Sequence, residues 1–450
     1  MKNSTLINLK DKKVVVFGLG VSGVSAVKLL TKLGANVYAV NSGDKQIWAK
    51  SQNLLSIIDL DHCFSESDSL TESIMSSADL LILSPGIPRD HKILNPIHKN
   101  QTTIWGEIEL GYKVIESLGE LKPIIAITGT NGKTTTTTFM GEMIEAQGKK
   151  AFVGGNIGTP FCDMALEVLS GNNPYDYIVL ELSSFQLEST IDFRPNIAMI
   201  LNIFQNHGER YTSIEDYAAA KFNITLKMQH DDVLIYPTDY DLINQWAQKQ
   251  NCKKIKFDTR KLDIQYDLKN YKLPGHHNLV NLNFVLKVCE ILNFQSSLVQ
   301  KCIDHFHGVH HRIEYVESQN SFKVFNDAKS TNWDATLTAI YAMEKQPKPL
   351  YLILGGKKRG HGDSILPHLE VIKEHVGRIY LIGEMALEIE NEIKGKMEYK
   401  NLENLKNVIN DVKGENFKGT LLFSPAFPSF DQFLNYAKRG ETFVELIKKS

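Results

Sequence analysis

Residues 124–135 have the sequence IIAITGTNGKTT, and the interpretation of the whole chain starts from this stretch. Its β-branched beginning predicts a strand, its glycines predict a loop, and the apolar spacing over 139–144 predicts that a helix follows. A strand, loop and helix with Gly-Lys-Thr at the turn is typical of a phosphate-binding loop. In such a loop, backbone N–H groups and the lysine meet the anion, and the hydroxyl can hold magnesium. Because Ile127 stands where the full Walker spacing has a glycine, a plain strand–turn–helix corner is the alternative.

Composition and charge exclude several classes of protein. The chain has 450 residues, enough for roughly three domains, and its formal net charge is -2 with acidic and basic residues interleaved. This pattern indicates neither a nucleic-acid partner nor a polybasic membrane surface. No apolar run approaches the ~18 residues of a membrane span, and the first residues lack the apolar core of a signal peptide. The five cysteines are scattered, which is typical of reduced thiols. We therefore expect a soluble, cytoplasmic, multidomain α/β protein. A monomer is the expected oligomeric state.

A second glycine-rich turn lies near the N-terminus. The expected strand 14–17 leads into Gly18-Leu19-Gly20-Val21-Ser22-Gly23, and a helical pattern follows over 26–30. Gly-x-Gly-x-x-Gly between a strand and a helix is the setting of a Rossmann fingerprint. The next strand ends in Asn41-Ser42 and lacks the acidic residue that holds the ribose of NAD, so another nucleotide diphosphate is favoured. A turn that only packs helix on strand is the alternative.

Several strand ends downstream carry polar or glycine residues. The strand 80–83 ends in Ser84-Pro85-Gly86, at the edge where open α/β sheets bind ligands. The run 104–119 is expected to be a helix and connector. The buried-type strand 177–180 delivers Glu181, a carboxylate well placed for magnesium after a phosphate loop, or else a helix-start residue.

Two further candidates follow the strand 197–202. The strand leads to His207, and Lys221 lies on an expected helix. Taken singly, His207 is a surface or packing histidine and Lys221 a solvated helix charge. A helix that starts within 274–281 places Asn278 and Asn281 on one face, since they are three residues apart.

Four histidines stand within residues 305–311. A zinc site is one interpretation, but no matching cysteine or carboxylate spacing accompanies them, so a domain junction is favoured. Beyond this junction, strands at 322–325, 350–354, 379–382 and 420–423 each end in polar or glycine residues before a helix. This alternation predicts another doubly wound α/β segment.

The motifs together resemble those of the Mur ligase superfamily, whose members are ATP-dependent enzymes that form amide bonds. The resemblance starts at Thr128-Gly129-Thr130-Asn131-Gly132-Lys133-Thr134 and covers the whole chain in order. It is most specific for the branch that adds D-glutamate to UDP-N-acetylmuramoyl-L-alanine in bacterial peptidoglycan synthesis, a pathway that serves cell shape and division. The motifs that carry it are GLGVSG at 18–23, SPGI at 84–87, ELSSFQL at 181–187 and SPAFPSFDQF at 424–433.

The resemblance implies three domains and a mechanism. Residues 1–115 would form a Rossmann-like UDP-binding domain, 116–308 a P-loop-type ATP-binding domain with a mainly parallel sheet, and 309–450 a Rossmann-like domain for the amino acid. ATP would phosphorylate the substrate carboxylate, and the amine of D-glutamate would attack the acyl phosphate. Elementary chemistry agrees, since a carboxylate needs phosphorylation to gain a good leaving group, and the clustered anions need cations around them.

The resemblance also implies roles for individual residues. Lys133, His207, Lys221 and Lys329 would be catalytic. Two magnesium ions would be held by Thr134, Glu181, His207 and Lys221, with Lys221 carrying a carbamate. ATP would be bound by Gly129, Thr130, Asn131, Gly132, Lys133, Thr134, Thr135, Asn278, Asn281, Arg312 and Asp327. The UDP substrate would contact Gly20, Val21, Ser22, Asn41, Ser42, Gly86, Asn156, Ser183 and Gln186. D-Glutamate would contact Lys329, Thr331, Arg359, Ser429 and Tyr436.

The chain departs from the family pattern at a few positions. Asn41 stands where relatives often have an acidic residue, the segment 205–210 replaces Asp-His-x-Asp-Arg, Tyr436 replaces a phenylalanine, and Arg359 replaces a lysine in some relatives. The spacing from 205–210 to Lys221 is one residue short. Other members of the superfamily, such as a different Mur ligase or a folylpolyglutamate synthase, and a non-catalytic nucleotide-binding protein of the same fold, are the alternative functions.

Overall fold

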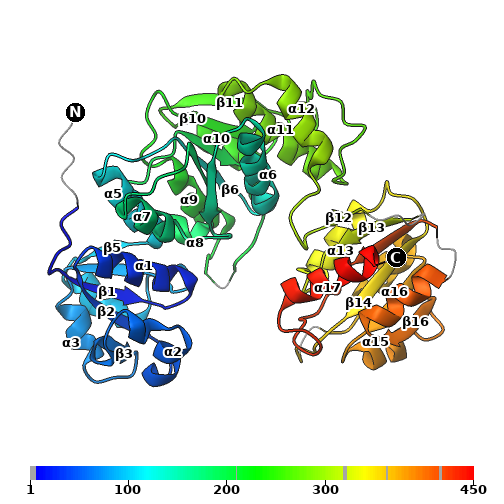
Figure 1. Cartoon of the computed structure of the whole chain (residues 1–450), viewed down its shortest axis with the longest axis horizontal. Coiled ribbons are helices and arrows are strands. Elements are labelled where there is room, and N and C mark those ends of the chain that lie inside the picture. The colour runs from blue at the N-terminus through cyan, green and yellow to red at the C-terminus, as the bar shows by residue number, and fades with distance from the viewer. Residues whose placement is uncertain (1–6, 209, 318–321, 361–362, 415–417, 450) are drawn as a thin grey trace. The chain divides into compact units, whose positions relative to one another are not determined.

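The structure is a computed structural model that describes residues 7–208, 210–317, 322–360, 363–414 and 418–449 (Figure 1). The chain folds into two compact units, one made of residues 1–264 with 281–299 and the other of 265–280 with 300–450. The described residues form three sheets, two in the first unit and one in the second. The expected α/β class with parallel sheets is confirmed. The domain boundaries at 115 and 308 stay a prediction.

The first sheet has five strands in the order β3-β2-β1-β4-β5, and every described pair is parallel. Parallel pairing requires a crossover between strands, and helices supply most of these crossovers. The strands are β1 (Lys13–Phe17), β2 (Asn36–Asn41), β3 (Cys63–Ser65), β4 (Leu80–Leu83) and β5 (Thr103–Trp105). The helices are α1 (Val21–Lys32), α2 (Lys45–Ser51), α3 (Thr71–Ser76), α4 (Asn95–Lys99) and α5 (Glu107–Ser117).

The run 104–119 differs from the expectation of a helix and connector. It begins inside the edge strand β5, and only then does α5 start at Glu107. A strand of three residues is too short to show a period of two, so its pairing with β4 decides its conformation.

The glycines of the N-terminal turn have a packing role. Gly18 has a φ of +89°, and its carbonyl accepts a hydrogen bond from the Ser84 hydroxyl at the end of β4. A Cβ atom on Gly23 would lie 2.0 Å from the Gly18 carbonyl oxygen. The first and third glycines are therefore required for α1 to pack closely on β1.

The second sheet has six strands in the order β11-β10-β9-β6-β8-β7, again with every described pair parallel. All five residues of β6 are buried, as expected for a strand covered on both faces. The strands are β6 (Ile124–Thr128), β7 (Ala151–Gly155), β8 (Tyr177–Glu181), β9 (Ile197–Ile200), β10 (Val233–Pro237) and β11 (Lys253–Phe257). The helices that follow in this part of the chain are α6 (Lys133–Ala146), α7 (Phe161–Leu169), α8 (Ser184–Leu187), α9 (Ile214–Phe222), α10 (Asp241–Gln248), α11 (His276–Ile291) and α12 (Ser296–His305).

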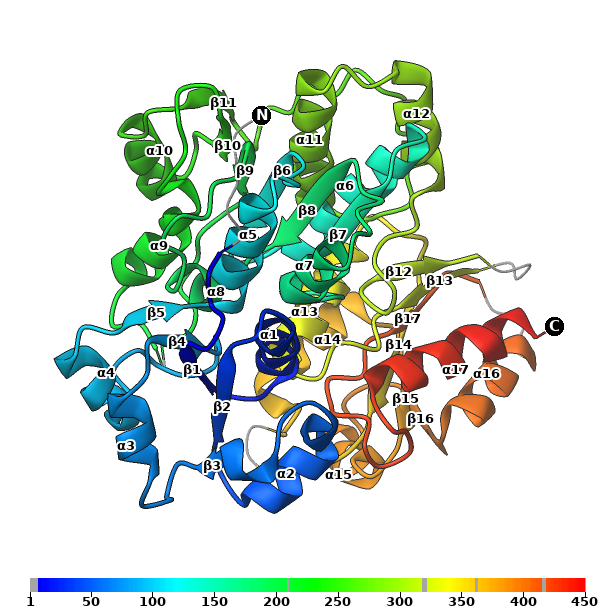
Figure 2. The same ribbon diagram turned by 60° about the vertical axis from the view of Figure 1, so that its left-hand side comes forward.

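Two buried glutamates at the start of α5 join the two sheets of the first unit, where α5 packs beside α7 (Figure 2). The Glu107 carboxylate accepts a hydrogen bond from the Cys162 backbone N–H at the start of α7, and burial raises the pKa of Glu107 to about 7. The Glu109 carboxylate accepts bonds of 2.8–3.1 Å from three consecutive N–H groups, those of residues 191–193. This loop leads into β9, so Glu109 fixes the entry to a central strand.

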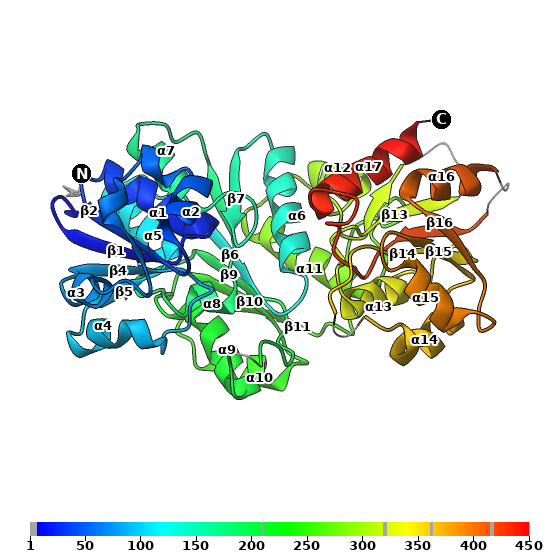
Figure 3. The same cartoon turned by 90° about the horizontal axis from the view of Figure 1, so that it is seen from below.

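The third sheet, in the second unit, has the order β12-β13-β17-β14-β15-β16. Only the described pair β12–β13 is antiparallel. Helices α16 and α17 cover one face and α13, α14 and α15 the other, each with its own apolar cluster (Figure 3). The strands are β12 (Glu314–Val316), β13 (Lys323–Asn326), β14 (Leu350–Gly355), β15 (Arg378–Ile382), β16 (Tyr399–Glu403) and β17 (Thr420–Phe423). The helices are α13 (Trp333–Ala342), α14 (Leu369–His375), α15 (Ala386–Ile393), α16 (Leu405–Gly414) and α17 (Tyr436–Lys448).

The three bonds to Glu109 make a testable contribution to stability. We expect Glu109→Ala to lower the free energy of unfolding by about 3 kcal/mol, since each buried N–H that loses its partner costs about 1–3 kcal/mol. Glu72→Ala, in the exposed first turn of α3, should change it by less than about 0.5 kcal/mol. Denaturant unfolding measures both, and equal losses in the two variants would refute the role of Glu109.

Candidate active site

The phosphate-loop stretch forms a tight turn between β6 and α6. Gly129 has a φ of +155° and Gly132 a φ of +84°, and Gly132 caps the N-terminus of α6. A Cβ atom on Gly132 would lie 2.5 Å from the Asn281 side-chain oxygen. Glycine at 132 is therefore required both by the backbone conformation and by the approach of Asn281.

Asn202, which the sequence analysis did not single out, holds this loop in place. It follows β9, the neighbour of β6 in the sheet, and its carbonyl accepts a bond of 3.0 Å from the Thr130 N–H. Its side-chain oxygen accepts 2.8 Å from the Asn131 N–H, and its side-chain amide donates 3.1 Å to the Asn131 carbonyl. Asn202 could have been found from the sequence, because it is a polar residue just after β9 and β9 pairs with the strand that carries the loop, β6.

Lys133 stands at the first position of α6 and its side chain folds back over the loop. Its ammonium donates to the Gly129 and Thr130 carbonyl oxygens, both at 2.9 Å. A lysine beside the N-terminus of a helix brings a full positive charge to a place where N–H groups already favour an anion. The expected arrangement of strand, loop and helix is present, and the binding of phosphate by this loop stays a prediction.

Lys221 is buried, so the interpretation of a solvated helix charge is wrong. Its side chain is 1% exposed and its amine donates 2.9 Å to the Gly129 carbonyl oxygen. The amine also lies 4.5 Å from the centre of the Tyr217 ring. Burial, and then the nearby Lys133, lower the pKa of Lys221 from 10.5 to about 6, while Glu181 opposes the shift. At neutral pH this amine is therefore uncharged, and an uncharged amine is a nucleophile.

Glu181 is the last residue of β8 and is 2% exposed, so it is not a helix-start residue. One carboxylate oxygen accepts a bond of 2.8 Å from the Asn156 side-chain amide, and Asn156 follows the neighbouring strand β7. Within the described part of the chain, no donor reaches the other oxygen. A buried carboxylate oxygen without a partner is costly, and a cation would satisfy it.

His207 lies in an aromatic cluster and has a φ of +56°. Its ring centre is 4.7 Å from that of Phe185 and 6.0 Å from that of Tyr217. Tyr217 therefore contacts both His207 and the Lys221 amine, and it brings two predicted metal residues into one cluster. Tyr217 could have been found from the sequence, because it lies four residues before Lys221 on one helix and therefore on the same helical face.

The residues predicted to bind UDP gather at one edge of the first sheet. Gly20 precedes α1, which begins with Val21 and Ser22. Asn41 is the last residue of β2 and Ser42 follows it. Gly86 follows β4. The carboxyl ends of parallel strands share this edge, which is where open α/β sheets bind ligands. Val21 is 73% exposed, and the Asn41 side-chain oxygen accepts 3.3 Å from the Leu19 N–H. Asn41 thus supports the glycine turn.

Ser183 and Gln186, predicted along the substrate path, hold each other at the start of α8. The Ser183 hydroxyl oxygen accepts 3.2 Å from the Gln186 N–H, and the Gln186 side-chain oxygen accepts 3.0 Å from the Ser183 N–H. This reciprocal capping box fixes the turn directly after Glu181.

Asn278 and Asn281 lie three residues apart on α11, which begins at His276. Asn281 packs against Gly132 of the phosphate loop. Asn278 belongs to the second unit, where its amide donates 2.7 Å to the Pro274 carbonyl oxygen. Both side chains are buried, at 5% and 4% exposed.

In the second unit, Asp327 follows β13 and Ser424 follows the neighbouring strand β17. The Ser424 hydroxyl donates 2.7 Å to one Asp327 oxygen, and the Ile313 N–H donates 3.2 Å to the other. Burial raises the pKa of Asp327 to about 7, although these bonds and Arg312 lower it.

Four of the five residues predicted to bind D-glutamate form two pairs. The Lys329 ammonium lies 5.9 Å from the centre of the Tyr436 ring. The Arg359 guanidinium donates 2.7 Å to the Thr331 carbonyl oxygen and 2.9 Å to Asp363. Ser429 is buried, 2% exposed. Two cations beside hydroxyl groups suit a ligand with two carboxylates.

Arg439 is a buried cation that the sequence analysis missed. It is 1% exposed and donates 3.0 Å to the Ala328 carbonyl oxygen, and burial lowers its pKa to about 10. Two of its other nitrogens have no acceptor among the residues that the structure describes. Nothing in its sequence neighbourhood separates it from an exposed helix arginine.

No three His, Cys, Asp or Glu side chains in the described ranges are grouped as ligands of a metal, so the zinc interpretation of residues 305–311 has no support. No described helix has the length and apolar character needed to cross a membrane.

Family profiles match two parts of the chain. Residues 12–106 match the description "Mur ligase MurD-like, N-terminal domain", and residues 127–299 match "Mur ligase middle domain".

Curated relatives match almost the full length. UDP-N-acetylmuramoylalanine--D-glutamate ligase of Trichlorobacter lovleyi is 32% identical over 465 residues, covering 98% of this chain and 100% of that protein. The protein of the same name from Koribacter versatilis is 34% identical over 466 residues, covering 98% of both. The one from Fusobacterium nucleatum subsp. nucleatum is 35% identical over 460 residues, covering 97% of this chain and 99% of that protein.

Solved structures share the fold at low identity. MurF ligase from Thermotoga maritima in complex with ADP has a TM-score of 0.56 at 15% identity, covering 100% of this chain and 98% of that one. A UDP-N-acetylmuramate-alanine ligase from the same organism has a TM-score of 0.53 at 20% identity, covering 96% and 98%. These similarities show the fold.

The buried amine of Lys221 predicts a pH dependence of stability. The unfolded chain keeps its proton up to a pKa of 10.5, whereas the folded chain releases it near pH 6. Unfolding therefore takes up a proton between these values, and the free energy of unfolding should rise with pH by about 1.4 kcal/mol per unit. Lys221→Met should lack this rise, measured by denaturant unfolding in CO2-free buffer. Equal pH slopes in both proteins would contradict the burial of an unmodified amine.

Proposed function

The chain belongs to the Mur ligase family, and on that premise we propose that it is an ATP-dependent ligase that joins D-glutamate to UDP-N-acetylmuramoyl-L-alanine. The relatives that carry this activity in their names match nearly the whole chain. The observation that carries the proposal is the cluster of Lys133, Glu181 and Lys221 around one phosphate loop. We place the enzyme in the cytoplasm as a monomer that builds a peptidoglycan precursor.

The proposed reaction activates a carboxylate. The substrate carboxylate attacks the γ-phosphorus of ATP, ADP leaves, and an acyl phosphate forms. The uncharged amine of D-glutamate then attacks the acyl carbon and forms an N–C bond, and the tetrahedral intermediate loses a proton from nitrogen to solvent and expels phosphate. Negative charge accumulates at each step, so the loop N–H groups and Lys133, preorganised at the N-terminus of α6, supply the stabilising charge.

The residues around Glu181 fit a magnesium site. The Glu181 oxygen that no donor of the described residues reaches is an oxygen ligand of the kind that magnesium prefers. The Thr134 hydroxyl, in the first turn of α6, is a second oxygen ligand of this kind. We assign one ion to Thr134 and Glu181 and a second to His207 and Lys221. Bound magnesium neutralises phosphate oxygens, and the chain's own part is to hold these ligands in place.

Lys221 is suited to carry a carbamate. Its uncharged amine can attack CO2, forming an N–C bond and releasing a proton, and the product is an anion where a cation stood. An anionic oxygen can bind magnesium, which an ammonium cannot. Burial and the charge of Lys133 both disfavour an ammonium at this position, whereas the negative charge of a carbamate would be attracted to Lys133.

The remaining sites follow from the strand ends. We assign UDP to the edge of the first sheet at Gly20, Asn41 and Gly86. The nucleotide contacts are assigned to Asn278, Asn281, Arg312 and Asp327. The two carboxylates of D-glutamate are assigned to the cations Lys329 and Arg359, with Thr331, Ser429 and Tyr436 supplying hydroxyl groups. The boundaries 1–115, 116–308 and 309–450 divide these three tasks.

Phosphate release tests the proposed reaction. Purified protein with ATP, magnesium and UDP-N-acetylmuramoyl-L-alanine should release phosphate when D-glutamate is added. Lys133→Ala should lose about 100-fold or more of this activity, since it removes the charge at the transferred phosphate, and Lys150→Ala, on the surface, should keep it. Release that requires L-alanine or meso-diaminopimelate instead would assign the chain to a different ligase. No release with any amino acid would favour a nucleotide-binding protein.

Chemical rescue tests the carbamate. Lys221→Ala should lose about 100-fold of the ligase activity by losing a metal ligand, and a short carboxylic acid should restore part of it. The same acid should not help Lys133→Ala, which lacks a cation. Full activity of Lys221→Ala without any addition would show that no carbamate is needed.

A further inference from the structure

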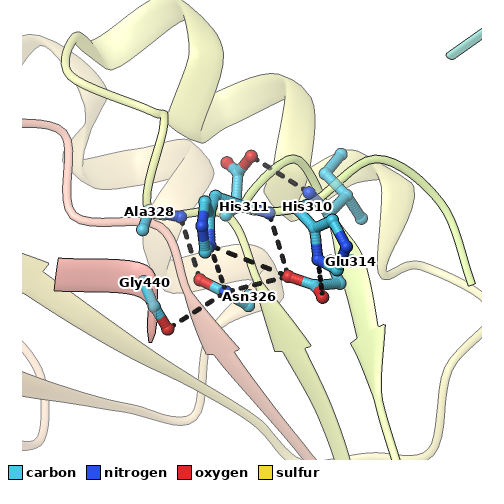
Figure 4. A network of polar contacts seen from close by, with 8 residues as sticks. His310, His311, Glu314, Asn326, Ala328 and Gly440 are labelled. Carbon is cyan, nitrogen blue, oxygen red and sulfur yellow. Dashed lines mark hydrogen bonds and ion pairs between the residues drawn. The ribbon is translucent and has the colours of Figure 1, made fainter. Parts of the chain in front are cut away.

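The loop around Arg312 is held by a network of polar contacts that the proposed function does not use (Figure 4). Its centre is the pair Glu314 and Asn326, which lie opposite each other in the antiparallel pairing of β12 and β13. Directly opposed side chains on one face of such a pair interact. Glu314 is 9% exposed and Asn326 is fully buried, so their polar atoms must find partners within the fold.

Glu314 binds the loop through both carboxylate oxygens. One accepts 2.9 Å from the His311 backbone N–H and 3.0 Å from the Asn326 amide. The other lies 2.8 Å from Nδ1 of His310. Figure 4 shows that these contacts converge on one carboxylate from three directions.

The orientation of Asn326 follows from its neighbours. The Ala328 N–H can only donate, so the atom 3.2 Å from it is the Asn326 oxygen, and the amide nitrogen faces Glu314 and His311. The amide nitrogen is 3.0 Å from Nδ1 of His311, which must therefore accept and carry its proton on Nε2. The same nitrogen lies 3.4 Å from the Gly440 carbonyl oxygen on α17. Asn326 thus links the loop, the strand and a helix.

The residues on both sides of Arg312 have left-handed backbones. His311 has a φ of +64° and Ile313 a φ of +46°, a conformation that is unfavourable for a β-branched side chain. Such conformations persist only where the surroundings over-determine them, and they are concentrated at functional sites. Here the His311 N–H is held by Glu314 and the Ile313 N–H by Asp327, while the Arg312 N–H donates 3.0 Å to Val309.

We propose that Glu314 and Asn326 are positioning residues that hold the turn at His311–Ile313, and with it Arg312, in the conformation from which Arg312 binds nucleotide. The proposal rests on the nucleotide role assigned to Arg312 in the proposed function. The Lys329 N–H also donates 3.0 Å to the His311 carbonyl oxygen, which connects this turn to a residue assigned to the D-glutamate site. Two buried carboxylates, those of Glu314 and Asp327, hold the N–H groups of both left-handed residues, which indicates a role for the residue between them.

A double-mutant cycle separates this role from a merely structural one. Calorimetry measures the Kd for ADP with magnesium in the full-length protein, for Glu314→Ala, Arg312→Ala and the double variant. We expect each single change to weaken binding about tenfold, and the double variant to bind within about twofold of Arg312→Ala, since residues that act as a unit are not additive. Glu314→Gln, which keeps an acceptor for the His311 N–H, should stay within about threefold of wild type.

Glu317→Ala, exposed and three residues away from Glu314, should bind as wild type does. Additive losses in the double variant, or unchanged binding by a folded Glu314→Ala, would overturn the inference. If Glu314→Ala does not fold, the Kd for ADP is measured for Asn326→Ala, alone and combined with Arg312→Ala, with the same expected values. A coupled cycle in a protein that releases no phosphate with D-glutamate would refute the proposed reaction and leave the positioning role standing.

Discussion

The hydrogen bond between the buried Lys221 amine and the Gly129 carbonyl is the interaction on which the candidate site depends. It joins α9 to the phosphate loop and places an amine where water does not reach it. Such a group loses its charge unless a partner compensates it, and here Lys133 stands nearby with a charge of the same sign. The site therefore holds a neutral amine, a cation and the unsatisfied Glu181 oxygen around one loop. That combination suits a centre that gathers anions and metal ions.

Buried carboxylates hold the backbone at several places in this fold. Glu109 accepts from residues 191–193, Asp327 from Ile313, and Glu314 from His311. Charge-assisted bonds to N–H groups are stronger than neutral ones, so one side chain can fix a loop that has no regular structure of its own. Loops that carry binding residues have few other means of staying ordered. The bonds of Asp327 and Glu314 lie directly beside Arg312, whereas that of Glu109 holds the entry to β9.

The order of the strands in each sheet explains which polar side chains form hydrogen bonds with one another. Asn202 after β9 holds the loop after β6, Asn156 after β7 binds Glu181 at the end of β8, and Ser424 after β17 binds Asp327 after β13. In each case the two strands are adjacent in a parallel sheet. The carboxyl ends of parallel strands lie at one edge, so polar residues that are far apart in sequence become first neighbours there. Arg439 and Tyr217 lie outside this rule, because helix packing brings them in.

The sequence by itself determined the α/β class, the strand, glycine loop and helix at 124–144, and the positions of Glu181 and Asp327 at the ends of their strands, because these depend on local periodicity and turn chemistry. It could not decide whether Lys221 was solvated or buried, since the same helix residue fits both. It also did not show that β5 precedes α5, that Asn202 holds the loop, or that His311 and Ile313 are left-handed. Only the tertiary structure decided these points. Burial, strand order and backbone strain come from contacts between distant segments, and desolvation by those contacts sets the charge of Lys221.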